Sequence, residues 1–99
     1  MARLVVLGGG ESGVGTAILG LKKGFEVFVS DKGEIQEKYK NVLEHFEIEW
    51  ESGQHTETKI LNADVVMKSP GIPDKVPLVR QLVHKGIPVI SEIEFASNY

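Results

Sequence analysis

The stretch Gly8-Gly9-Gly10-Glu11-Ser12-Gly13 decides how this chain folds, because of what lies on either side of it. It follows the apolar run Leu4–Leu7, which lacks alternation and suits a strand buried on both faces of a parallel sheet. It precedes apolar residues with the spacing of one helical face, namely Val14, Ala17, Ile18 and Leu21. A glycine-rich turn between a strand and a helix is typical of a nucleotide-binding βαβ unit.

The rest of the chain repeats this alternation of strand and helix. After the first strand we predict four more strands, over 25–30, 47–51, 64–68 and 87–90. We predict helices over 14–23, 35–46, 78–85 and 92–99. The loop 53–63 contains one helical turn at most. Such alternation implies parallel strands joined by right-handed crossovers. We therefore predict an α/β fold, a Rossmann-like doubly wound five-stranded parallel sheet with strand order 3-2-1-4-5, as a single domain over residues 1–99.

Composition excludes several classes of function. The 99 residues carry 11 Lys and Arg against 14 Asp and Glu, a formal charge of −3, which argues against a general nucleic-acid or anionic-membrane binder. The absence of cysteine excludes disulfides, thiolate metal sites and cysteine nucleophiles. No apolar run approaches the roughly 20 residues that a membrane helix needs. The first residues lack the features of a secretory signal, so a cytoplasmic location is expected.

The glycine stretch contains the pattern G-x-G-x-x-G, and each position has a physical role. Gly8 allows a tight turn, Gly10 lets the phosphates of a ligand approach the backbone, and Gly13 lets the following helix pack closely. Ser12 adds a hydroxyl donor, whereas Glu11 brings negative charge and is expected to face solvent or to cap the helix. The alternative is a glycine-rich turn that binds nothing.

Asp31 ends the second predicted strand, about 20 residues after the glycine motif, where a dinucleotide fold places an acid that binds a ribose diol. A carboxylate there would repel a 2′-phosphate, so NADP is disfavoured. The alternative is that Asp31 only begins a turn or caps the next helix.

The segment Lys68-Ser69-Pro70-Gly71 lies at the carboxyl end of the fourth predicted strand. Ligands of open α/β sheets bind outside these ends, where the strand order reverses. We expect this loop to face the glycine loop and to offer the Ser69 hydroxyl, the Gly71 amide and, as a further phosphate contact, the Lys68 ammonium. A plain turn rich in proline is the alternative.

No catalytic residue and no metal site is predicted. The three histidines, His45, His55 and His84, are scattered and do not have the spacing of metal ligands. The carboxylates of Glu47, Glu49 and Glu51 alternate along one strand and are interpreted as a solvated edge without partners, with Ile48 and Trp50 facing inward. The serines at positions 30, 69 and 91 show no base beside them, and neither G-x-S-x-G nor the P-loop pattern occurs.

Taken together, these motifs resemble the N-terminal domain of the Mur ligases. The matching segments are the glycine loop, Ser30-Asp31-Lys32, Ser69-Pro70-Gly71-Ile72-Pro73 and Gly86–Phe95, and the likeness extends over essentially the whole chain. Ser-Pro-Gly-Ile-Pro and the later Ser-Glu-Ile-Glu are more specific than the glycine motif, and they point to the branch that adds D-glutamate.

The resemblance implies a domain that holds the UDP part of UDP-N-acetylmuramoyl-L-alanine in bacterial peptidoglycan synthesis. In the Mur ligases, ATP, Mg²⁺ and D-glutamate depend on further domains, so these 99 residues alone would not form the amide bond. Carried over to this chain, the contacts with UDP fall on Gly10, Glu11, Ser12, Gly13, Asp31, Lys32, Ser69, Pro70 and Gly71.

The chain departs from some members of that family at two places. Lys32 and Gly33 stand where those members have a hydroxyl and an arginine, so the side-chain contact from position 33 is lost and Lys32 is expected to compensate. Glu11 replaces an apolar residue, so a contact there would use its backbone amide.

Two other functions remain open from the sequence. The glycine motif and Asp31 would also suit an NAD-binding domain of an oxidoreductase or a nucleotide-sensing regulatory module, although neither explains Ser69–Pro73. A scaffold or interaction domain would bind no nucleotide.

Overall fold

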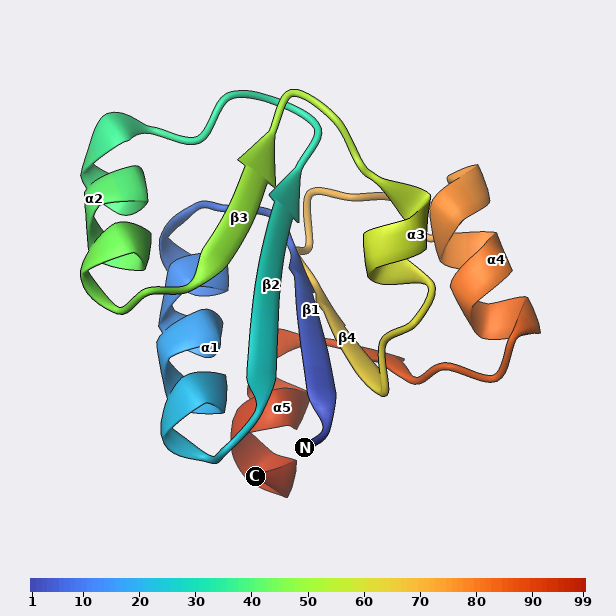
Figure 1. The fold of residues 1–99 in the computed structure, drawn as a ribbon. Helices are drawn as coiled ribbons and strands as arrows, with labels where there is room; N and C mark the ends of the chain where they lie inside the picture. The colour runs from blue at the N-terminus through green and yellow to red at the C-terminus, as the bar shows by residue number, and fades with distance from the viewer.

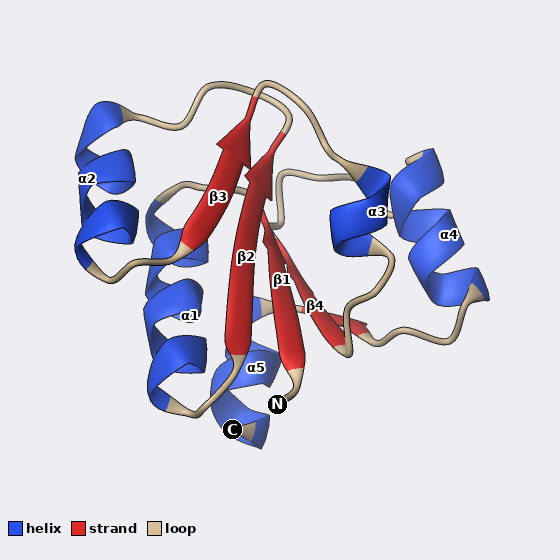
Figure 2. Ribbon diagram, viewed as in Figure 1, coloured by secondary structure: helices blue, strands red, loops and turns tan.

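Five parallel strands form the centre of the molecule, and helices cover both faces of the sheet (Figures 1 and 2). The computed structural model describes residues 1–99. The strands are β1 (Arg3–Leu7), β2 (Glu26–Asp31), β3 (Glu49–Ser52), β4 (Val65–Lys68) and β5 (Val89–Ile90). The helices are α1 (Glu11–Lys22), α2 (Glu37–His45), α3 (Glu57–Ile60), α4 (Pro77–His84) and α5 (Glu92–Asn98). The order β3-β2-β1-β4-β5 confirms the predicted fold and topology.

Strand β1 is buried on both faces, which explains why its sequence does not alternate between apolar and polar residues. Leu4 and Val6 belong to the larger apolar cluster, on the face covered by α1, α2 and α5. Val5 and Leu7 belong to the smaller cluster, on the face covered by α3 and α4. Val6 and Leu7, at the carboxyl end of β1, are both fully buried, so the glycine loop that follows begins on the packed core.

The prediction for the edge strand β3 is correct for its apolar residues, but two of the carboxylates predicted to lack partners have them. Ile48 is buried and Trp50 is half-buried, as predicted. Glu47 lies outside the strand in a left-handed turn, with φ of 57°. Glu49 pairs with Lys59 at 3.0 Å, and Glu51 accepts hydrogen bonds from neighbouring residues. These partners come from other segments, which alternation along one strand cannot reveal.

Helix α5 runs from the carboxyl edge of the sheet back towards its opposite end. A capping box begins the helix, in which the Glu94 amide donates to Ser91 Oγ and the Ser91 amide donates to the Glu94 carboxylate. Near its other end Phe95 and Tyr99 pack against Phe25, with ring centroids 5.6 and 5.1 Å from the Phe25 ring. None of the helices in the fold has the length and apolar character that crossing a membrane requires.

Candidate functional site

Two loops lie against each other at the carboxyl ends of β1 and β4, where the strand order reverses. Gly8 has φ of 111°, and a Cβ built on it would stand 2.7 Å from Cβ of Ser69. The Ser69 amide donates to the Leu7 carbonyl oxygen at 3.0 Å, so the second loop continues the pairing of the two strands. Ligands of open α/β sheets bind at this position, and both predicted loops are there.

Gly13 sets how closely α1 approaches the glycine loop. A Cβ on Gly13 would lie 1.8 Å from the carbonyl oxygen of Gly8, a distance that no real contact allows. Gly10 differs, because a Cβ there would meet nothing within 4 Å. The first turn of α1 therefore rests on the loop at Gly13, and the surface above Gly10 is open.

Ser12 is the residue of this region whose side-chain hydrogen bonding is not satisfied within the chain. Its Oγ is buried and has no hydrogen-bond partner, and it is the one buried side-chain polar atom in the structure of which this is true. A buried hydroxyl without a partner costs about 1–3 kcal/mol. Ser12 lies in the first turn of α1, where unpaired backbone N–H groups also favour an anion.

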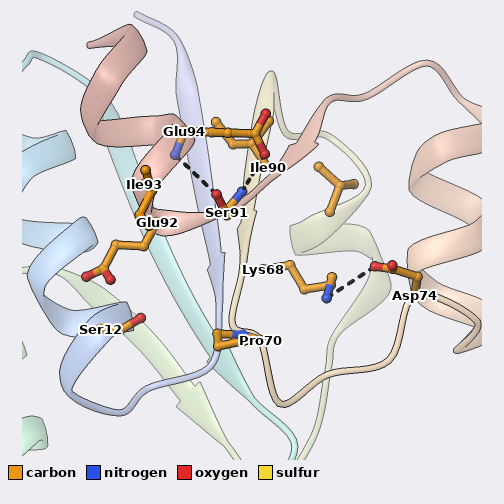
Figure 3. A pocket seen from close by; sticks show the side chains of 10 residues that line it. Ser12, Lys68, Pro70, Asp74, Ile90, Ser91, Glu92, Ile93 and Glu94 are labelled. Atoms are coloured by element: carbon orange, nitrogen blue, oxygen red, sulfur yellow. Dashed lines mark hydrogen bonds and ion pairs between the residues drawn. The ribbon is translucent and has the colours of Figure 1, made fainter.

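Ser12 lines a cavity of about 510 Å³, which we name the α5 cavity because the start of α5 forms one of its walls. Figure 3 shows the Ser12 hydroxyl on one side of this space, Pro70 and Lys68 on another, and the first residues of α5 above them. The lining residues are Ser12, Lys68, Pro70, Asp74, Val89, Ile90, Ser91, Glu92, Ile93 and Glu94. The contribution of α5 was not predicted, although the Ser-x-x-Glu pattern of a capping box is visible at residues 91–94.

The ammonium of Lys68 already has partners. It donates to the Ile72 carbonyl oxygen at 2.6 Å and pairs with the Asp74 carboxylate at 3.2 Å (Figure 3). The Lys68 side chain is 14% exposed and that of Asp74 is 89% exposed. Since exposed pairs are weak, the Asp74 carboxylate is a partner that Lys68 can exchange for another anion.

Asp31 joins the end of β2 to the glycine loop. Its Oδ2 accepts the Gly9 amide at 2.8 Å and its Oδ1 accepts the Gly33 amide at 2.9 Å. The carboxylate therefore begins a turn, as one reading of the sequence held, and also fixes the position of the loop at the mouth of the crevice. Lys32 follows it and is exposed.

A second cavity of about 280 Å³, the His55 cavity, opens beside Asp31 and Lys32. His55 is a further polar lining residue, and the rest of the lining is formed by Gly71, Ile72, Pro73, Val76, Pro77 and Leu78. Pro70 lines the α5 cavity and Gly71 lines the His55 cavity, so the turn at Ser69–Gly71 stands between the two.

Sequence reasoning missed a cluster under the His55 cavity, because it found no base beside Ser30. Ser30 is fully buried, and its Oγ lies 2.8 Å from Oε2 of Glu51 and 2.7 Å from Nδ1 of His55. Thr56 donates to Glu51 through both its amide and its hydroxyl. Only the register, which pairs Ser30 with Glu51, could have indicated this contact.

The cluster shifts two pKa values. Burial alone would raise the pKa of Glu51, but the hydrogen bonds donated by Thr56 and Ser30 outweigh it and hold this pKa below its usual range. Burial lowers the pKa of His55, with Lys32 acting in the same direction and the carboxylates of Glu51 and Asp31 opposing it. The imidazole of His55 is therefore neutral at pH 7.

The predicted site residues are thus divided between two cavities. Ser12, Lys68 and Pro70 line the α5 cavity, and Asp31, Lys32 and Gly71 line the His55 cavity. The others belong to the loops beside them and line neither space, namely Gly10, Glu11, Gly13 and Ser69. Glu11 is exposed and makes no capping bond. No group of three or more His, Asp or Glu residues is placed to hold a metal ion.

Comparison with known proteins places this arrangement among relatives. The family described as the MurD N-terminal domain matches residues 3–76. The UDP-N-acetylmuramoylalanine–D-glutamate ligase of Christiangramia forsetii is 67% identical over 95 residues, which are 96% of this chain and 21% of the relative. The ligase of the same name from Bacteroides thetaiotaomicron is 59% identical over 99 residues, 100% of this chain and 22% of the relative. The chain thus spans about a fifth of the length of these curated relatives.

Solved structures share the fold at lower identity. A murein peptide ligase from Psychrobacter arcticus superposes with a TM-score of 0.86 at 19% identity, over 99% of this chain and 20% of that one. At this identity the likeness bears on the fold alone.

Proposed function

Since the chain belongs to the family of MurD N-terminal domains, we propose that it holds the UDP part of UDP-N-acetylmuramoyl-L-alanine for a ligase of peptidoglycan synthesis in the bacterial cytoplasm. The diphosphate lies at the start of α1, beside the α5 cavity, and the uracil lies in the His55 cavity. The ligand passes over the turn at Ser69–Gly71. Both ends of this path lie at the carboxyl edge of the sheet.

The unpaired hydroxyl of Ser12 is the observation that carries the proposal. A phosphate oxygen is an acceptor only, so it would complete the hydrogen bonding of Ser12 Oγ and of the free N–H groups of α1 together. The open surface above Gly10 leaves room for the phosphate. Lys68 adds positive charge once its ammonium turns from Asp74.

The names of the relatives support the choice of ligand. They are ligases of a UDP-linked substrate and of D-glutamate, and the chain matches about a fifth of their length. We propose that ATP, Mg²⁺ and D-glutamate bind to the rest of such a protein, where the substrate carboxylate is phosphorylated and the amine displaces phosphate to form the amide. Residues 1–99 supply affinity and orientation for that reaction, and none of the bond-forming groups.

Titration of the ¹⁵N-labelled chain with UDP tests the proposal. We expect the amide signals of Gly10–Gly13, Asp31 and Gly71 to move, while those at the opposite edge of the sheet, such as Glu26 and Asp64, stay in place. Unchanged spectra at millimolar UDP would rule the proposal out. NAD serves as the control for the alternative function, because displacement of UDP by a lower concentration of NAD would favour a dinucleotide domain.

A further inference from the structure

We propose that His55 selects the base of the nucleotide: Nε2 of its neutral ring accepts the imide N–H of uracil, and Ser30 and Glu51 hold the ring in the tautomer that makes this possible. The inference rests on the proposed function, because it takes the ligand to be a uridine nucleotide with its base in the His55 cavity. It assigns a role to a histidine that lies outside all the sequence motifs.

The count of protons in the cluster fixes the tautomer. Ser30 Oγ has one proton, and two of its neighbours, Glu51 Oε2 at 2.8 Å and the Gln54 carbonyl oxygen at 3.3 Å, can only accept it. If the hydroxyl donated to His55 instead, lone pairs of Ser30 and Glu51 would face each other. The hydroxyl therefore donates to these oxygens, Glu51 Oε2 being the nearer, and Nδ1 of His55 donates to Ser30 Oγ across 2.7 Å.

This arrangement leaves Nε2 of His55 as an acceptor. A neutral imidazole carries one proton, and when Nδ1 holds it Nε2 presents a lone pair. Nδ1 is the ring nitrogen with a partner in the structure, whereas Nε2 makes no hydrogen bond. Because His55 lines the cavity, this acceptor is available to an N–H group of a ligand bound there.

Burial of the ring, acting against the charges around it, favours its neutral form, and this makes the selection depend on pH. Glu51 faces His55 from β3, and Asp31 and Lys32 face it from the end of β2. The opposite side of the cavity, between Gly71 and Leu78, contributes uncharged lining residues only. Burial and Lys32 oppose protonation more strongly than the two carboxylates favour it.

The lining of the cavity suits a planar base with a polar edge. Ile72, Pro73 and Leu78 form an apolar wall, and His55, Asp31 and Lys32 supply the polar groups. Uracil and cytosine have the same size and differ at this edge, since N3 of uracil carries a hydrogen and N3 of cytosine is an acceptor. A fixed acceptor at His55 therefore accepts uracil and repels cytosine.

The test compares UDP with CDP on the labelled 99-residue chain, with the amides of Gly10–Gly13 reporting the diphosphate that both share. We expect UDP to bind roughly tenfold more tightly than CDP at pH 7.5. CDP loses the hydrogen bond to His55 and places its acceptor N3 against the acceptor Nε2. His55→Phe should bring the two affinities within about twofold, and His55→Gln, whose side-chain oxygen can accept, should restore part of the preference. His84→Phe, a change on the exposed part of α4, is the matched control and should keep the full preference.

Two further measurements test the tautomer and the positioning residue. Nitrogen shifts of His55 should identify Nδ1 as protonated and Nε2 as bare at pH 7.5, and Ser30→Ala should give a mixture of tautomers and a smaller preference for UDP. The preference should also decline as the pH falls and the ring gains its second proton.

Equal affinities for UDP and CDP in the unmodified chain, or a proton found on Nε2, would overturn the role of His55. In that case, movement of the Gly10–Gly13 amides with both nucleotides would leave the proposed function standing. If neither nucleotide moved these amides, the proposed function itself would fail.

Discussion

The carboxylate of Asp31 holds the amide of Gly9 at 2.8 Å, and this bond ties the end of β2 to the loop that follows β1. The two residues lie far apart in the sequence and meet at the mouth of the crevice. The acid at this position therefore shapes the glycine loop before any ligand arrives. Its second oxygen fixes the turn at Gly33 in the same way.

Asp31→Ala should lower both stability and affinity. It leaves two backbone N–H groups without their acceptor, so we expect the free energy of unfolding to fall by about 1–3 kcal/mol and UDP to bind more weakly. Asp64→Ala is the control, because Asp64 accepts the Arg3 amide at the opposite end of the sheet. In urea unfolding, both variants should be less stable than the unmodified chain. In UDP titration, only Asp31→Ala should bind more weakly.

A methyl group at Gly13 should be far more damaging than one at Gly15 in the same helix. The Cβ of Gly13→Ala would overlap the Gly8 carbonyl oxygen, so the helix or the loop must move, at a cost of about 1–3 kcal/mol or more. The Cβ of Gly15→Ala meets nothing within 4 Å and should stabilise the helix by about 0.5–1 kcal/mol. The midpoint of thermal unfolding should lie below that of the unmodified chain for Gly13→Ala and above it for Gly15→Ala. An unchanged midpoint for Gly13→Ala would contradict the prediction.

Ser12→Ala should separate binding from stability. The hydroxyl has no partner within the chain, so its removal should raise the free energy of unfolding, by up to about 1–3 kcal/mol, while UDP binding weakens about tenfold. Ser91→Ala is a useful contrast, because it removes the cap of α5 and should cost about 1 kcal/mol of stability. Unchanged affinity in Ser12→Ala would remove the main support for the phosphate position.

Lys68 and Asp74 should have opposite effects on binding. Lys68→Met removes the cation of the α5 cavity and should weaken UDP about fivefold or more. Asp74→Asn frees the ammonium from its exposed partner and should strengthen UDP about twofold at low salt. The effects of both substitutions on UDP affinity should become smaller as salt is added. If Asp74→Asn weakened binding as much as Lys68→Met, the pair would serve to hold the loop instead.

The fold should lose stability as the pH falls below about 6.5, the ordinary value for histidine. The pKa of His55 is lowered in the fold, chiefly by burial, so in the window beneath 6.5 the unfolded chain takes up a proton that the folded chain does not. The lowered pKa of Glu51 adds a further loss below its ordinary value of 4.5. Urea unfolding at pH 7.5 and 5.5 measures the first effect. In His55→Gln the free energy of unfolding should change less between these two pH values. An equal change in the variant and the unmodified chain would contradict the role of His55.

The parts of this fold that sequence reasoning predicted are those set by neighbours along the chain. The apolar run of β1, the turn at Gly8 and the helical spacing that begins at Val14 are local, and they led to the correct strand order. The close contact of Gly13 with the loop also follows from its place in the motif. Local patterns were enough because each strand and each crossover has the usual length and handedness.

The residues that sequence reasoning misjudged are those whose partners come from another segment. Glu51 looks like a solvated carboxylate from the alternation of its strand, yet it faces Ser30 because β3 pairs with β2 in one register. His55 lies in a loop without periodicity and meets Ser30 only when that loop turns over the end of β2. Spacing along the chain contains no information on either contact.

The turn at Ser69–Gly71 stands between two cavities, and this has a consequence for affinity. A ligand that fills one cavity holds its other end at a high effective concentration beside the second, so a joined molecule binds far more tightly than its separated halves. Uridine and inorganic diphosphate should each bind weakly. UDP should bind more tightly than either, because its two halves are covalently joined. On the proposed function, the position of this turn between the cavities would let a small surface act as a two-point receptor.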